Sequence, residues 1–220
     1  MNKKNNARKC KICGGVTNPL FDSAFKITYD VCDRCNFTYK QPQHHISYDE
    51  EKSLYDTHEN SLENKGYVAM FERFLAQGVT PFITQGKALD FGSGPGPVLY
   101  ELLKQNGYDA NHYDPFFHPD ECALKTRYDL ITSTEVFEHL SDVLSTVETL
   151  LSALKPGGYL AVMTSFRPEK NHDFLNWWYR RDPTHIAFHT LESMRYIEKQ
   201  TSLNIIFHNQ KNIITFEKRG

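Results

Sequence analysis

A glycine-rich turn at residues 92–96 constrains the fold of this chain more than any other segment. An apolar stretch at residues 87–91 precedes the turn and is typical of a buried strand. Residues 97–106 follow it and predict a helix, since proline is favoured in the first helical turn. Glycine allows tight backbone turns, and the start of a helix offers unpaired N–H groups to a ligand. The sequence D-x-G-x-G-x-G, from Asp90 to Gly96, therefore predicts a strand–turn–helix unit that binds a ligand.

Short apolar segments alternate with amphipathic ones from this turn onwards, which is typical of an α/β protein. The last two apolar segments are too close for a crossover and should pair as an antiparallel hairpin. Only 13 residues separate Asp114 from Tyr128, so a third strand there is short or missing. We expect a doubly wound, mostly parallel Rossmann-like sheet with a C-terminal antiparallel hairpin. The expected later strands are residues 109–113, 128–133, 159–164, 203–208 and 212–217, and the expected later helices are residues 136–154 and 191–200.

An acidic residue also follows the second expected strand. Asp114 stands 20 residues beyond Gly94, where a carboxylate can accept the hydroxyl hydrogens of a ribose. A dinucleotide-binding enzyme would have G-x-G-x-x-G, but Pro97 takes the place of the third glycine. The order of acid, glycines and second acid instead resembles motif I of class I S-adenosylmethionine-dependent methyltransferases. The resemblance extends to residues 128–131 and 154–158 and covers about residues 66–220.

The resemblance implies a set of cofactor-binding residues near the ends of the first strands. Asp90 would meet the amino group of the methionine moiety, and Asp114 would hold the ribose. The absence of a full third strand leaves the adenine contact open, and Phe116 or Phe117 is suited to stack on the base. The cofactor-binding residues that we expect are Asp90, Gly92, Gly94, Asp114, Phe116 and Glu135.

The pattern E-x-x-E-H follows the third of these strands. Glu135, Glu138 and His139 would share one face of the next helix, because residues three and four apart lie on one side. Two carboxylates and an imidazole can hold a divalent cation. The pattern resembles the metal site of ubiquinone-biosynthesis O-methyltransferases and of small-RNA 2′-O-methyltransferases. Those proteins add a later histidine, which His185 would supply here.

Two interpretations of this pattern stay open. In one, Glu135, Glu138, His139 and His185 hold a second metal that lowers the pKa of an acceptor hydroxyl. In the other, no metal binds, the glutamates benefit from the helix dipole, and His185 is the general base. In both, the catalytic candidates are Glu135, His139 and His185.

Four of the five cysteines lie in the first 35 residues. Cys10 and Cys13 form one Cys-x2-Cys pair, and Cys32 and Cys35 form another 18 residues later. In a chain without an export signal, this clustering indicates a metal rather than disulfides, and the spacing is typical of a structural zinc ribbon or knuckle with four cysteine ligands. We therefore expect a zinc-binding module at residues 1–40, a connector or lid at residues 41–65 and a methyltransferase domain at residues 66–220.

Two further segments carry candidate pocket residues. The connector lies where family members keep a lid over the cofactor, and its candidates are Tyr55, His58 and Asn60. The loop after residues 159–164 is rich in aromatic and basic side chains, which either wall a planar, acidic substrate or pack the loop onto the sheet. Its candidates are Trp177, Trp178, Tyr179, Arg180 and Arg181.

Charge is uneven along the chain. Residues 1–40 carry eight Lys or Arg and three Asp or Glu, a balance of +5. The remaining residues carry a balance of −7, and the two sum to the net charge of −2. A basic N-terminal module favours an anionic partner such as RNA, or it is a solvated tail.

Three functions fit these features. The first is methylation of oxygen or carbon on a small-molecule substrate, which the acidic body and aromatic loop favour. The second is RNA methylation, with the basic module holding the substrate, and the third is a non-catalytic protein, which the intact acid and glycine set disfavours. No apolar run approaches the roughly 18 residues of a membrane span, and no secretory signal follows the charged N-terminus. We expect a cytoplasmic protein without membrane contact, and no protein partner is evident.

Overall fold

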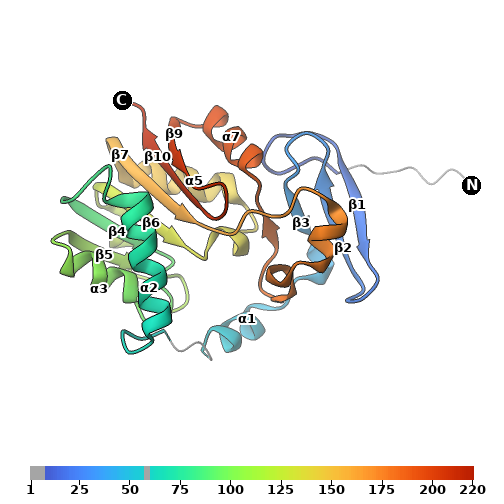
Figure 1. Cartoon of the computed structure of the whole chain (residues 1–220), viewed down its shortest axis with the longest axis horizontal. Helices are drawn as coiled ribbons and strands as arrows, with labels where there is room; N and C mark the ends of the chain where they lie inside the picture. The colour runs from blue at the N-terminus through green and yellow to red at the C-terminus, as the bar shows by residue number, and fades with distance from the viewer. Residues whose placement is uncertain (1–7, 57–59) are drawn as a thin grey trace, which may run out of the picture.

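The computed structural model describes residues 8–56 and 60–220 and arranges their strands in two sheets (Figure 1). The larger sheet has the strand order β5-β4-β6-β7-β10-β9, and the smaller has the order β1-β2-β3-β8. The strands of the larger sheet are β4 (Lys87–Phe91), β5 (Asp109–Tyr113), β6 (Tyr128–Thr134), β7 (Leu154–Met163), β9 (Leu203–His208) and β10 (Ile213–Lys218). Those of the smaller sheet are β1 (Thr17–Asp22), β2 (Ile27–Cys32), β3 (Thr38–Lys40) and β8 (Ala187–Phe188).

The larger sheet is mostly parallel. Strands β5, β4, β6 and β7 run in one direction, whereas β10 is antiparallel to both β7 and β9. Central strands such as β6 are buried along almost their whole length, as expected when both faces of a parallel sheet are covered. The expected Rossmann-like α/β class and C-terminal antiparallel hairpin are confirmed.

The third strand of the usual parallel order is missing. Residues 114–127, all of which the structure describes, form a turn and the short helix α4 (Cys122–Lys125). Asp114 and His118 close the turn through a pair of backbone hydrogen bonds of 3.0 and 2.9 Å. Strand β5 therefore lies at the edge of the sheet, as the short interval in the sequence predicts.

Helices cover both faces of the larger sheet, which gives two apolar layers. On one face lie α2 (Lys65–Phe74) and α3 (Val98–Gln105), and on the other lie α5 (Val143–Ala153) and α7 (Leu191–Gln200). Each helix turns a stripe of apolar residues at three- and four-residue spacing towards the sheet. Buried examples are Phe71, Phe74, Leu99, Leu103, Val147, Leu150, Met194 and Ile197.

The expected helix at residues 136–154 was wrong at its beginning. Glu135 has a left-handed φ of +53°, a single 3-10 turn spans Phe137–His139, and α5 begins only at Val143. Asp142 caps α5 because its side chain accepts a 3.1 Å hydrogen bond from Ser145 N. The Ser141-Asp142 pair therefore marks the helix start, and the E-x-x-E-H pattern belongs to the loop before it.

The N-terminal module packs against the larger domain and shares its core (Figure 1). Strand β3 pairs with β8, which lies almost 150 residues later, through Thr38 with Phe188 and Tyr39 with Ala187. A buried ion pair joins Asp22 of β1 to Arg180, and each side chain is 4% exposed. The N-terminal module therefore packs against the segment that follows β7.

The connector forms the helix α1 (Tyr48–Tyr55), which begins with a capping box between Ser47 and Glu50. Figure 1 shows α1 below the sheets, between the N-terminal module and α2. None of the helices in the described ranges is both long and apolar enough to cross a membrane.

Candidate functional site

A cavity of about 530 Å³ lies at the carboxyl ends of β4, β5 and β6. Ligands of open α/β sheets bind at this edge, because the loops there come from neighbouring strands. Most of the residues singled out in the sequence line this one cavity. They are Tyr55, Asn60, Asp90, Gly92, Gly94, Asp114, Phe116, Glu135, His139, Trp178, Tyr179 and His185.

The glycine-rich turn has no room for a side chain at Gly92 or Gly96. Gly92 has a φ of +80°, and a Cβ atom there would lie 2.2 Å from a methyl group of Val136. A Cβ atom on Gly96 would lie 1.8 Å from the carbonyl oxygen of Asn60, which belongs to the connector. The turn therefore brings bare backbone to the cavity wall, as a cradle for a ligand requires.

Asp90 is a buried carboxyl group at the end of β4, with an exposed fraction of 2%. Burial raises its pKa to about 7, although hydrogen bonds from the Thr132 hydroxyl and the Tyr100 backbone act in the opposite direction. The Thr132 bond is 3.2 Å long. A buried acid of this kind gains from a cationic ligand, because the cation favours its charged form.

Asp114 ties the glycine-rich turn to the next loop. Its Oδ2 accepts a 2.9 Å hydrogen bond from Gly94 N, and its Oδ1 accepts bonds of 2.8 and 3.1 Å from Phe116 N and Phe117 N. Phe116 in turn stacks on Tyr48 of α1, with ring centroids 4.7 Å apart. The aromatic residue suggested for a base contact thus lies between the cavity and the connector helix.

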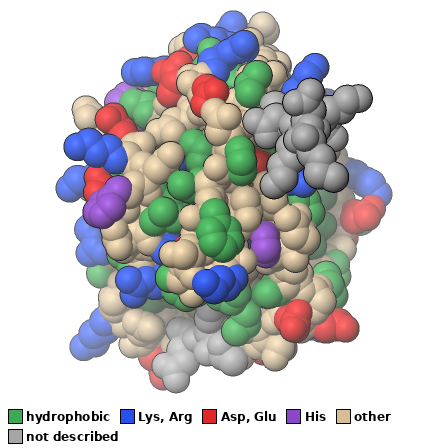
Figure 2. All heavy atoms as spheres, turned by 90° about the vertical axis from the view of Figure 1, so that its right-hand side faces the viewer, with side chains coloured by type: hydrophobic (Ala, Val, Ile, Leu, Met, Phe, Trp, Pro, Cys, Tyr) green, Lys and Arg blue, Asp and Glu red, His purple; other side chains and the backbone are tan. Residues whose placement is uncertain are grey.

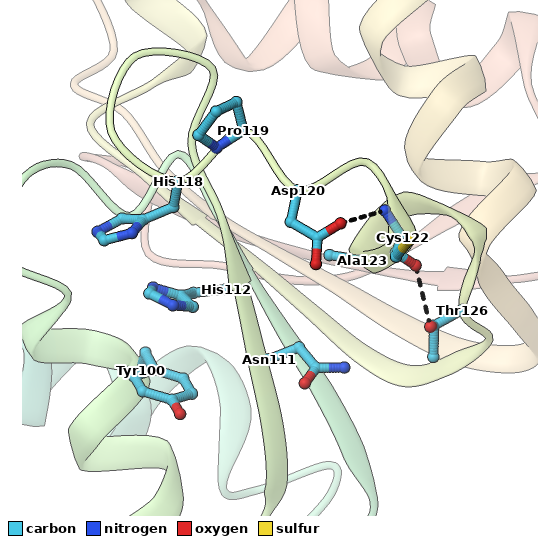
Figure 3. Close-up of a pocket in the computed structure, with 9 residues that line it drawn as sticks. All are labelled: Tyr100, Asn111, His112, His118, Pro119, Asp120, Cys122, Ala123 and Thr126. Carbon is cyan, nitrogen blue, oxygen red and sulfur yellow. Dashed lines mark hydrogen bonds between the residues drawn. The ribbon is translucent and has the colours of Figure 1, made fainter.

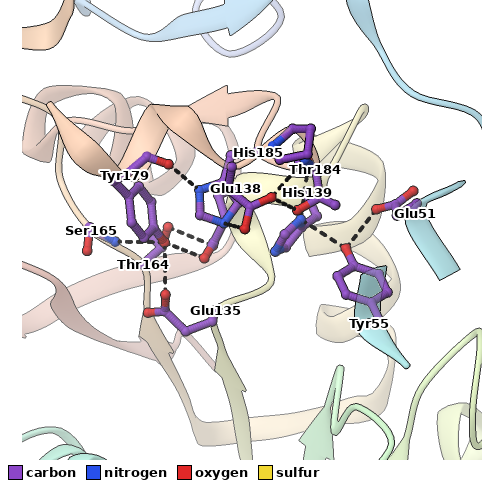
Figure 4. Close-up of polar contacts among 12 residues, drawn as sticks. Glu51, Tyr55, Glu135, Glu138, His139, Thr164, Ser165, Tyr179, Thr184 and His185 are labelled. Atoms are coloured by element: carbon purple, nitrogen blue, oxygen red, sulfur yellow. Dashed lines mark hydrogen bonds and ion pairs between the residues drawn. The ribbon is translucent and has the colours of Figure 1, made fainter. Parts of the chain in front are cut away.

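Glu138, His139 and His185 form an acid–histidine cluster (Figure 4). One ligand atom from each lies within 4.8 Å of the others. Glu138 is fully buried, and its carboxylate accepts hydrogen bonds from the hydroxyl groups of Thr164, at 2.9 Å, and Tyr179. The cluster therefore joins the loop after β6 to the loop after β7.

The hydrogen bonds of the two histidines define their tautomers. The Nδ1 atom of His185 lies 2.7 Å from the carbonyl oxygen of Tyr179, so Nδ1 carries the hydrogen. The Nδ1 atom of His139 lies 3.2 Å from the carbonyl oxygen of Thr184 and 3.0 Å from the Tyr55 hydroxyl, which donates to Glu51. Each ring therefore has its lone pair on Nε2. Burial and the neighbouring His139 lower the pKa of His185, which keeps its ring neutral.

Glu135 lies outside the three-residue cluster. Its carboxylate accepts a 3.1 Å hydrogen bond from the Tyr179 hydroxyl, which also reaches Glu138 (Figure 4). Burial and the charge of Glu138 raise the pKa of Glu135 well above its usual value. Tyr179 thus bridges the two glutamates. The shared helical face expected from the sequence does not exist, because a 3-10 turn spans Phe137–His139.

The four N-terminal cysteines also form a cluster. Sulfur atoms of Cys10 and Cys35 lie 3.6 Å apart, those of Cys13 and Cys32 lie 3.3 Å apart, and all four lie within 4.8 Å of one another. Backbone N–H groups of Ile12 and Arg34 point at sulfur, each at 3.4 Å. The bond with the Cys35 thiol lowers the pKa of Cys10 to about 5. Four sulfurs, a favoured thiolate and N–H donors fit a tetrahedral zinc ion.

The remaining sequence candidates have separate positions. Tyr55 and Asn60 line the cavity, whereas His58 lies outside the described residues. Trp178 stands at the cavity wall and is 68% exposed, but Trp177 packs beside Phe174 in a separate apolar cluster. The guanidinium of Arg180 is buried against Asp22, so this side chain packs the loop and does not face a substrate.

Several residues of this site were missed in the sequence. Thr132 and Thr164 supply hydroxyl donors to buried carboxylates, and Asp182 lines the cavity beside His185. A second cavity, of about 550 Å³, lies at the open edge of β5 and was also missed (Figure 3). It is lined by Tyr100, Asn111, His112, His118, Pro119, Asp120, Cys122, Ala123 and Thr126.

Comparison with known proteins decides the family. A family model described as a methyltransferase domain matches residues 65–206. The chain belongs to this methyltransferase family. The expectation of a methyltransferase is thereby confirmed. A search of curated proteins finds no match to this methyltransferase.

Solved structures share the fold of this methyltransferase at low sequence identity. An S-adenosyl-L-methionine-dependent methyltransferase from Methanococcus maripaludis is 20% identical, with a TM-score of 0.50 over 78% of this chain and 92% of that one. The 1,6-didemethyltoxoflavin-N1-methyltransferase of Burkholderia thailandensis is 12% identical, with a TM-score of 0.51 over 92% and 100%. Mitomycin 7-O-methyltransferase is 13% identical, with a TM-score of 0.57 over 78% and 58%.

Proposed function

We propose that this methyltransferase methylates an oxygen atom of a small hydroxylated acceptor with the help of a divalent cation. The observation that carries the proposal is the shared cavity, whose lining includes the glycine-rich turn and two members of the acid–histidine cluster, His139 and His185. The third member, Glu138, is fully buried. We name the two groups the cofactor end (Asp90, Gly92, Gly94 and Asp114) and the acceptor end (Glu138, His139 and His185).

The cofactor end suits S-adenosylmethionine, which supplies an electrophilic methyl group when bound. Asp90 holds the amino group of the methionine moiety, since a buried carboxyl group gains from a nearby ammonium. Gly92 and Gly94 let the cofactor approach the backbone, and Asp114 accepts hydrogens from the ribose. Phe116 provides a ring for the adenine, and Glu135 completes the wall towards the acceptor end.

The acceptor end suits a divalent cation, which supplies a lowered pKa to a neighbouring hydroxyl group when bound. Glu138 brings a buried carboxylate, and His139 and His185 bring Nε2 lone pairs. Glu135 adds a second acid through Tyr179. If the site acts without metal, His185 Nε2 accepts the proton of the acceptor hydroxyl. The resemblance to ubiquinone-biosynthesis O-methyltransferases belongs to this proposal.

The N-terminal module holds a structural zinc ion in this proposal, because all four ligand positions are filled by cysteine. We keep the division into a module at residues 1–40, a connector at residues 41–65 and a catalytic domain at residues 66–220. The proposed zinc stabilises the three strands β1, β2 and β3, of which β3 pairs with β8.

A small molecule suits the site better than RNA. Two of the structural neighbours are named for methylation of small compounds, mitomycin and 1,6-didemethyltoxoflavin. On the face formed by the N-terminal module, Lys and Arg side chains are scattered among hydrophobic and uncharged ones (Figure 2). Lys40 is buried, and Lys11 and Arg34 donate to backbone carbonyl groups. Some of the basic side chains of the module therefore bind other parts of the protein and are not available to an RNA.

The test uses the zinc-loaded protein with a catechol, 3,4-dihydroxybenzoate, and a monophenol, 4-hydroxybenzoate, as acceptor probes. We expect methyl transfer to the catechol, loss of transfer when a chelator removes the second cation, and retention of the cysteine-bound zinc. Transfer that survives chelation would refute the role of the divalent cation and leave His185 as the general base. Failure to bind S-adenosylhomocysteine in calorimetry, or methylation of an RNA oligomer instead, would overturn the proposal.

A further inference from the structure

Lys40, the last residue of β3, is a buried cation with an exposed fraction of only 1%. Burial lowers its pKa to about 8, while the charge of Asp182 acts in the opposite direction. Within residues 8–56 and 60–220, no carboxylate oxygen lies within ion-pair distance of its ammonium group. Its Nζ donates a 2.7 Å hydrogen bond to the carbonyl oxygen of Pro183. A buried ammonium is costly unless it is hydrogen-bonded, so the bond to Pro183 fixes the place of this side chain.

Lys40 holds both ends of a four-residue segment. Its side chain donates to Pro183 O, and its backbone N–H donates to Ile186 O at 2.8 Å. Thr184 and His185 lie between these two points. The pairing of β3 with β8 continues the same contact through Ala187 and Phe188.

The held segment touches every member of the acid–histidine cluster. It contains His185 itself, and Ile186 N donates a 2.8 Å hydrogen bond to the carbonyl oxygen of Glu138. The carbonyl oxygen of Thr184 accepts from His139 Nδ1 at 3.2 Å (Figure 4). A shift of the segment would therefore separate His185 from Glu138 and turn the ring of His139.

We propose that Lys40 is a positioning residue that sets the place of His185 against Glu138 and His139, and so couples the N-terminal module to the acceptor end. This inference rests on the proposed function of the acceptor end. The module has a second anchor on the same loop, the buried pair of Asp22 and Arg180, but that pair lies before the segment. Lys40 is the module residue that spans His185 directly.

The experiment compares Lys40→Met, which keeps the length and removes the ammonium, with Lys40→Arg, which keeps a donor. Lys26→Met, at an exposed position in the turn between β1 and β2, is the control. The first readout is the imidazole ¹H–¹⁵N spectrum of His185, assigned with His185→Gln. The second is the affinity of the acceptor end for Co²⁺ in the zinc-loaded protein. It is measured from the visible absorption of bound Co²⁺, and the absence of thiolate charge-transfer bands shows that the cysteine site keeps its zinc. The third is affinity for S-adenosylhomocysteine.

For Lys40→Met we expect loss of the Nδ1–H signature of His185 and a 10- to 100-fold lower Co²⁺ affinity, as for changes around metal ligands. Affinity for S-adenosylhomocysteine should stay within about twofold, and Lys40→Arg should recover most of the Co²⁺ affinity. If Lys40→Met does not fold, Lys40→Gln, one bond shorter, should show the same changes. Unchanged His185 signals and Co²⁺ affinity would overturn the inference. Absence of Co²⁺ binding in the wild type would instead refute the metal proposal, and the His185 spectrum would still test Lys40.

Discussion

The cofactor end and the two histidines of the acceptor end line one cavity, but the two ends are assembled over different ranges of the chain. The cofactor end comes from Asp90 to Asp114, a single strand–turn–helix–strand unit. The acceptor end unites a loop after β6 with residues near 185, and its second half is held by a strand from the N-terminal module. The cofactor end therefore depends on local backbone conformation, whereas the acceptor end depends on packing between distant segments.

Because the two ends are built differently, we expect a given substitution to disturb one end before the other. Damage to the N-terminal module should reach the acceptor end first, because β8 and the segment at residues 183–186 pair with β3. Loss of the Asp90 charge at the cofactor end should leave the acid–histidine cluster in place. Four changes, from the largest expected effect to the smallest, test this asymmetry.

The largest effect is expected for Cys35→Ser, which removes one of four sulfur ligands. We expect loss of bound zinc and a fall in unfolding free energy of about 4 kcal/mol, which corresponds to about 10 °C in Tm for a chain of this size. Zinc analysis and calorimetry measure both. Cys122→Ser is the control, because Cys122 is exposed and lies outside the cluster. Full zinc content in Cys35→Ser would refute the four-cysteine zinc site.

Asp90→Asn should remove the anionic partner of the cofactor's amino group without changing the shape of the site. We expect affinity for S-adenosylmethionine to fall about 10- to 150-fold, since hydrogen bonds to charged groups carry about 1.5–3 kcal/mol. The variant should also be more stable than the wild type at pH 8, by up to about 4 kcal/mol at 1.4 kcal/mol per pKa unit. Asp109→Asn, at an exposed position on β5, is the control. Unchanged affinity would exclude Asp90 from the cofactor site.

Glu138→Gln should affect the acceptor end alone. We expect Co²⁺ affinity there to fall about 10- to 100-fold or more, because a fully buried carboxylate is replaced by a neutral amide. Affinity for S-adenosylhomocysteine should remain that of the wild type. Glu148→Gln, on the exposed side of α5, provides the matched control. A parallel loss of cofactor affinity would show that the two ends are not independent.

The smallest effect concerns pH. Burial raises the pKa of Asp90 from 3.8 to about 7, so its carboxyl group gains a proton as the pH falls through about 7. Cofactor affinity should therefore decline below pH 7 by up to about tenfold per pH unit. The free energy of unfolding should change in the opposite direction and fall as the pH rises from about 4 to 7. In this range the folded chain keeps a proton on Asp90 that the unfolded chain has released. A flat affinity profile in the wild type would contradict this account of Asp90.

The fold and the cofactor end could be predicted from the sequence because their signals are local. The strand, the glycines and Asp114 lie within about 30 residues, and the Cys-x2-Cys spacing is equally compact. The start of α5 at Val143 was missed because the cap at Asp142 was not recognised. Lys40 and Tyr179 could not be assigned, because their partners Pro183 and Glu138 lie 143 and 41 residues away and become neighbours only in the fold.

The central claim is that one cavity holds the cofactor at one end and a divalent cation at the other. Line broadening of bound S-adenosylhomocysteine by Mn²⁺, measured by NMR on the zinc-loaded protein, tests it most directly. We predict strong broadening of the protons next to the sulfur atom, and its loss in Glu138→Gln with cofactor affinity unchanged. Equal spectra with and without Mn²⁺, while the cofactor is bound, would contradict the claim.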